Sequence, residues 1–146
     1  MVMFFLNNVD ILNEMYKVVT MGIVGIDEVR DKILCRELKD IIVSEKKVYQ
    51  KYKLEISKLL NKESETPKEI NLFVKMFNEM YTDIKLLKDD DKKIVKMMIE
   101  GMNKGILKLN GFKNNDMDNL NKNEQKILLE LLDELESHIN KMKPYL

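Results

Sequence analysis

The only histidine of the chain, His138, lies four residues after Glu134 in the segment ELESHINK. Residues with this spacing lie on the same side of an α-helix, so the carboxylate and the imidazole could belong to one metal site. Glu134 falls about a quarter turn from the apolar stripe of its helix and is expected to touch water. A histidine at the edge of such a stripe is more often a packed residue whose nitrogens contact water or a carboxylate. A metal role is therefore the less common alternative.

Glu45 is the second residue whose position could support chemistry. It falls inside an apolar stripe, between Ile42 and Tyr49. An unpaired carboxylate there would lose its hydration or take up a proton, so we expect it to have a partner. The candidates are the hydroxyl of Tyr16 or Tyr49, a lysine, His138 or a metal ion. A contact between Glu45 and His138 would respond to pH but would not be a catalytic site, because neither a nucleophile nor a third orienting group is evident.

Other patterns typical of enzymes are missing from the sequence. Because His138 is the only histidine, no Ser-His-Asp set can form without it. The sequence also has no glycine-rich phosphate loop and no cysteine cluster that could hold zinc. We therefore expect that the protein is not an enzyme and needs no cofactor. If a cofactor is present, the candidate metal ligands are Glu45, His138 and Glu134, and the metal would be iron, manganese or zinc.

The composition limits the classes of partner. With 146 residues, 45% of them hydrophobic, the chain suits a single domain covering residues 1–146. Lys plus Arg and Asp plus Glu number 25 each, so no overall field attracts nucleic acid. The single Cys35 cannot form an internal disulfide, and no stretch approaches the roughly 18 apolar residues of a membrane span. These features predict a cytoplasmic protein without a membrane span.

Helical patterns run through most of the chain, because only two prolines and five glycines interrupt it. Apolar residues recur every three to four positions along five segments, as on one face of an α-helix. The predicted segments are residues 9–33, 36–62, 67–87, about 91–110, and a last helix that begins after Asn121 and ends at Pro144.

Residues typical of helix ends support these segments. The predicted N-terminal caps are Asn7 or Asn8, Thr66, one of Asp89, Asp90 and Asp91, and Asn121. Gly111 fits a C-terminal stop after Asn110. A break near residues 88–91 is expected because one helix over 67–110 would be about 65 Å long, far longer than its neighbours.

The segments predict an all-α fold, an antiparallel four-helix bundle in which helices one and two form one hairpin and the last two helices form another. If the hairpins lie side by side, the chain crosses the length of the bundle between them, and residues 67–87, about 30 Å long as a helix, suit that crossing. Glycines in MGIVGI (21–26) and EGMNKGI (100–106) lie midway along their helices, where a missing side chain permits close helix approach.

Five segments occur in a characteristic order: the mid-helix GIVG, the second helix RDKILCRELKDIIVSEKKVYQKY, the TPKE link, the junction DIKLLKDDDKKIVKMMIEGMNKGI and the closing ESHINKMKPYL. In this order the chain resembles small bacterial helical-bundle proteins of the ferritin-like superfamily. The resemblance spans nearly the whole chain and implies a ferritin-like bundle with an extra crossover helical segment between helices two and three. It also implies that metal-binding members take one Glu from each of two helices and a Glu-x-x-His pair from each of the other two.

This sequence departs from that ligand pattern. Gly22 stands at the position of the first helix where a carboxylate is expected, and Glu45 is followed three residues later by Val48 rather than a histidine. Leu135 stands three residues before His138, where the motif has a glutamate. The resemblance therefore predicts the fold and argues against the usual di-iron function.

The leading hypothesis is a non-catalytic ferritin-like bundle that acts through contacts with another protein or with itself, as a homodimer. The apolar MVMFFL end, helix one and residues 67–87 would supply that interface. A degenerate metal-binding bundle of the di-iron type is the alternative. A small-molecule or lipid pocket inside the methionine-rich bundle is a third hypothesis.

Overall fold

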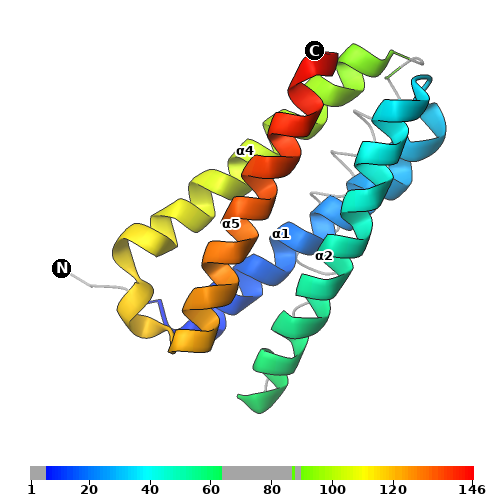
Figure 1. Cartoon of the computed structure of the whole chain (residues 1–146). Coiled ribbons are helices and arrows are strands. Elements are labelled where there is room, and N and C mark those ends of the chain that lie inside the picture. Colours follow the sequence, from blue (N-terminus) through cyan, green and yellow to red (C-terminus); the bar gives the residue numbers. More distant parts are fainter. Residues whose placement is uncertain (1–5, 64–86, 88–89) are drawn as a thin grey trace.

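The computed structural model describes residues 6–63, 87 and 90–146. Within this part of the chain all regular structure is helical, as predicted, and four long helices form a bundle (Figure 1). The long helices are α1 (Asn8–Val29), α2 (Arg36–Lys62), α4 (Asp91–Asn115) and α5 (Lys122–Met142). Short 3₁₀ turns follow α1, α4 and α5, at η1 (Arg30–Lys32), η3 (Met117–Asn119) and η4 (Lys143–Tyr145). Of these described helices, none is both long enough and apolar enough to cross a membrane.

The predicted caps begin three of the long helices. Asn7 and Asp10 form a capping box at α1, and Asn121 and Glu124 form another at α5, so in each pair both side chains bind the backbone of the other. The Asp90 side chain accepts hydrogen bonds from the first backbone amides of α4. Because each cap binds amides that have no partner inside the helix, these residues fix where the helices start.

Two predicted helix ends differ from the structure. The helix expected over residues 9–33 gives way to the η1 turn after Val29, although Ile33 remains buried. The stop at Gly111 was wrong, because α4 continues through this glycine to Asn115. The extra turn buries Phe112, and the gain from burying a phenylalanine exceeds the roughly 1 kcal/mol that a glycine costs inside a helix. The helix predicted over residues 67–87 lies outside the described residues, except for Leu87.

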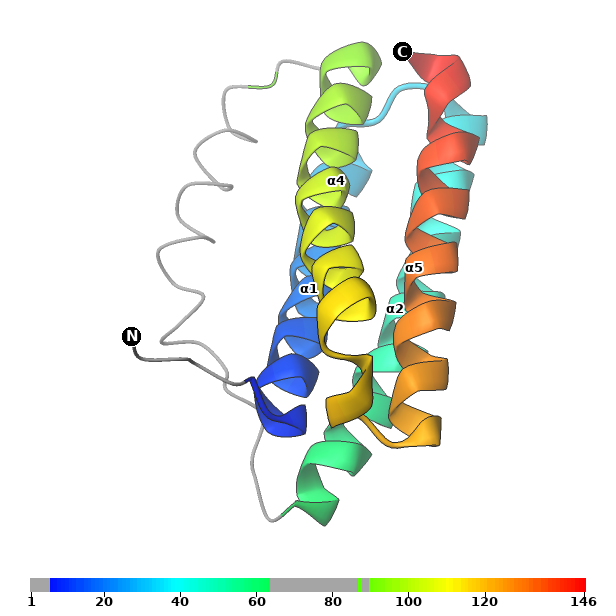
Figure 2. The same ribbon diagram turned by 90° about the vertical axis from the view of Figure 1, so that its left-hand side faces the viewer.

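Hydrogen bonds between distant segments show which helix ends lie together. At one end of the bundle the backbone amides of Leu34 and its neighbour Cys35, in the turn between α1 and α2, each donate to the Asp91 carboxylate at 2.8 Å. At the other end the Asn8 side chain donates to Glu63 at 3.1 Å and to Glu124 at 3.3 Å. The end of α2 and the beginning of α4 therefore lie at opposite ends of the bundle (Figure 2).

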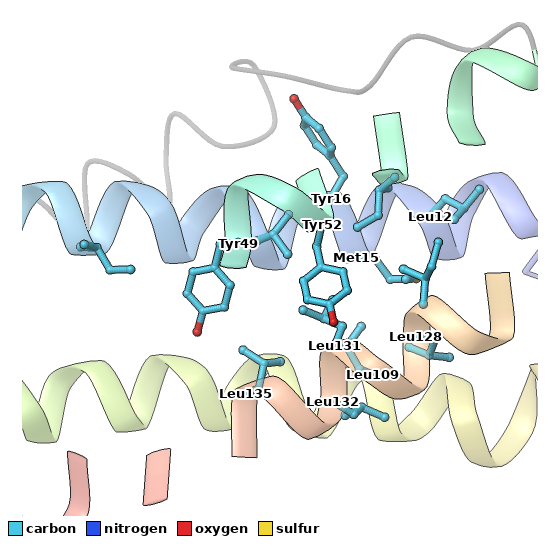
Figure 3. Close-up of a cluster of buried hydrophobic side chains, with 14 of the residues drawn as sticks. Leu12, Met15, Tyr16, Tyr49, Tyr52, Leu109, Leu128, Leu131, Leu132 and Leu135 are labelled. Carbon is cyan, nitrogen blue, oxygen red and sulfur yellow. The ribbon is translucent and has the colours of Figure 1, made fainter. Parts of the chain in front are cut away.

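The core runs between the four helices and consists mainly of leucine, isoleucine and tyrosine side chains (Figure 3). Helices α1 and α2 pack along each other, α5 packs against both α2 and α4, and α1 also contacts α4. Most predicted stripe positions are buried, but Met98, Met102 and Gly105 of α4 are only half-buried. These three residues lie along the one side of α4 that borders an open groove.

Candidate functional site

Two polar residues of α2 and one of α5 form a buried cluster at the centre of the bundle. Glu45 and Tyr49 lie one turn apart on α2, and their side chains are 3% and 1% exposed. His138 of α5 is 1% exposed, and its Nδ1 lies 3.2 Å from the Tyr49 hydroxyl, within hydrogen-bonding distance. The two rings meet edge to face, with centroids 6.1 Å apart. This contact joins α2 to α5 at the centre of the bundle.

Sequence reasoning found the members of this cluster but not its pairing. Tyr49 was a candidate partner for Glu45, and the imidazole nitrogens of His138 were expected to contact water or a carboxylate. The structure instead pairs the Tyr49 hydroxyl with His138. Tyr49 lies on the apolar stripe of its helix and His138 lies at the edge of its own stripe, which was the available signal. The apolar stripe of α2 or of α5 alone does not show that these two helices face each other.

One polar atom of Glu45 and one of His138 are buried inside the bundle. Glu45 Oε1 and His138 Nε2 have no hydrogen bond within the described part of the chain. Burial raises the pKa of the Glu45 carboxyl to about 7, with Glu134 adding to the effect and Lys141 opposing it. Burial also lowers the pKa of His138 to about 4, and the positive charge of Lys141 acts in the same direction. At neutral pH the imidazole is therefore neutral, and Glu45 is divided between its two forms.

The three predicted metal ligands lie in one region of the bundle. Glu134 is half-buried on α5 and close enough to Glu45 to shift its pKa. Within residues 6–63, 87 and 90–146, no group of three or more His, Cys, Asp or Glu side chains is arranged to hold a metal ion. Protein metal sites usually take at least three protein ligands, so the fit is poor. The assignment of Glu45, His138 and Glu134 as metal ligands stays a prediction.

A groove of about 410 Å³ opens between α1 and α4. Its walls include Met21 of α1 and Met98 and Met102 of α4, and its floor reaches Tyr49 of α2 and Leu135 of α5. Figure 3 shows Tyr49 and Leu135 within the buried cluster of the core. The groove therefore extends from the surface to the centre of the bundle and touches all four long helices. Tyr49 belongs both to its floor and to the polar cluster.

Three mid-helix glycines line the groove, and the structure explains two of them. A Cβ atom on Gly22 would lie 2.8 Å from Cε2 of Tyr49, too close for any real contact. A Cβ on Gly105 would lie 3.2 Å from Cγ1 of Val18. At these two positions the predicted close helix packing is present. A Cβ on Gly101 would meet no atom of the described residues within 4 Å, so close packing does not account for this glycine.

Charged side chains surround the mouth of the groove. Lys108 and Glu14 form an ion pair across it at 2.7 Å, joining α4 to α1. Lys17, Glu100 and Lys104 complete the charged rim. The groove thus has an apolar interior and a polar edge, the usual composition of a binding site.

Comparisons with protein-family models, curated proteins and solved structures find no match to this chain. The resemblance to ferritin-like proteins therefore stays a prediction. Inferences about function depend on the cluster and the groove themselves.

Proposed function

We propose that this protein is a non-catalytic helical bundle that acts through protein contacts, by pairing with a second copy of itself over the groove between α1 and α4. The observation that carries the proposal is the groove itself, an apolar trough flanked by methionines and framed by charges. Methionine side chains are flexible and polarisable, and they are common on surfaces that adapt to a partner. The polar cluster supports a non-catalytic role, because His138 is buried and holds its hydrogen bond to Tyr49.

The charges on the rim support self-association over other occupants. In a two-fold dimer the same surface meets itself, so a useful interface must be self-complementary. The rim carries both signs, with Glu14 and Glu100 beside Lys17, Lys104 and Lys108. A lysine of one copy can therefore face a glutamate of the other. The balance of 25 basic and 25 acidic residues leaves no net charge to oppose the approach of two copies.

We also propose the ferritin-like, antiparallel arrangement of two hairpins, α1–α2 and α4–α5, with a crossover between them. The support is the position of the helix ends: Glu63 lies beside Asn8, whereas Asp91 lies beside Leu34 at the opposite end. A chain that leaves α2 at one end and begins α4 at the other has to travel the length of the bundle. The cytoplasm remains the proposed location, with the unpaired Cys35 as its support.

Light scattering coupled to size exclusion, over a hundredfold range of concentration, tests self-association. The informative variant is Gly101→Arg, because Gly101 lines the groove and a side chain there meets no described atom within 4 Å. The matched control is Gly111→Arg, on the same helix, with equally open space and away from the groove. We expect a dimer for the wild type and the control and a monomer for Gly101→Arg. A wild type that remains monomeric at the highest concentration refutes the proposal.

The alternative is a degenerate metal-binding bundle. It is favoured by two buried atoms, Glu45 Oε1 and His138 Nε2, which have no hydrogen-bond partner among the described residues and are both able to bind a metal ion. Elemental analysis of protein purified without chelator, followed by titration with iron, manganese and zinc, tests it. Stoichiometric metal in the wild type that is lost in Glu45→Gln would establish this function. Equal, substoichiometric metal in both proteins would exclude Glu45 as a ligand.

A further inference from the structure

We draw no further inference here: the strongest candidate, the interior of the apolar groove between α1 and α4, belongs to the surface already proposed for the dimer, and nothing in the described part of the structure shows what else would cover it.

Discussion

Replacing Glu45 by glutamine should change how the stability of the fold depends on pH. Burial raises the pKa of the Glu45 carboxyl from 4.5 to about 7, with Glu134 adding to the effect and Lys141 opposing it. Between these two values the folded state binds more protons than the unfolded chain. The contribution of Glu45 is therefore fully present below pH 4.5 and is lost as the pH rises through 7. Its size is about 3 kcal/mol in the free energy of unfolding.

His138 acts in the opposite sense. Burial and the charge of Lys141 lower its pKa from 6.5 to about 4, so the folded state binds fewer protons than the unfolded chain in this window. Its contribution is present above pH 6.5 and is lost as the pH falls through 4, and it is also about 3 kcal/mol. Between pH 4.5 and 6.5 the contribution of Glu45 falls with pH while that of His138 rises, so in the wild type the two changes with pH nearly cancel.

Each variant should expose the contribution that remains. From about pH 4 to 7, the free energy of unfolding of Glu45→Gln should rise by about 3 kcal/mol relative to the wild type, because only His138 still titrates. For His138→Gln it should fall by about the same amount relative to the wild type. Glu136→Gln is the control, because Glu136 is exposed on α5 and its loss should leave the profile unchanged.

Urea unfolding followed by circular dichroism, in half-unit steps from about pH 4 to 8, measures these differences. Taking the difference between each variant and the wild type at the same pH removes the contributions of all other titrating groups. A difference between Glu45→Gln and the wild type that stays constant across this range would refute the reasoning, since Glu45 would then titrate alike in the folded and unfolded states.

Three further substitutions test the packing of the bundle, each by the free energy of urea unfolding. Tyr49→Phe should cost about 1 to 3 kcal/mol because it leaves the buried Nδ1 of His138 without its partner, and a cost near zero would contradict that hydrogen bond. Gly22→Ala should destabilise the fold by about 1 to 3 kcal/mol because its Cβ would meet the Tyr49 ring. Gly101→Ala should stabilise it by up to about 1 kcal/mol, because alanine favours a helix more than glycine and its Cβ would meet no described atom within 4 Å. Changes of the same sign at both positions would refute this contrast. Asp91→Ala should cost about 2 kcal/mol because its carboxylate accepts two backbone hydrogen bonds from the turn between α1 and α2, and an unchanged midpoint would show that these bonds add nothing.

The helices could be predicted from the sequence because their signals are local. A stripe of apolar residues at helical spacing and a capping side chain are both properties of one segment, so α2 was predicted at its observed bounds, Arg36–Lys62. The burial of Glu45 followed from the same stripe. The helix end predicted at Gly111 was wrong because the next residue, Phe112, is buried in the core. That burial is a property of the packing and outweighs the local preference for a stop.

The candidate site could be predicted only in part, because its geometry depends on pairs of helices. The sequence identified Glu45 and His138 as unusual, but the hydrogen bond from His138 to Tyr49 requires the register between α2 and α5. The position of the groove could not be predicted from the sequence. Met98 and Met102 were predicted as stripe positions, and they are half-buried because they line the groove between α1 and α4.

Tyr49 is the residue that joins the two features of this protein. Its hydroxyl meets His138, its ring packs against the backbone of Gly22, and its side chain forms part of the groove floor. A ring held on two sides has little freedom to move, so the floor is rigid, while the methionine walls are adaptable. A rigid floor sets the depth of the groove, and flexible methionine walls can adapt to whatever packs against them. His138 therefore holds the Tyr49 ring at the floor of the groove through the hydrogen bond to its hydroxyl, which accounts for a buried histidine at this position.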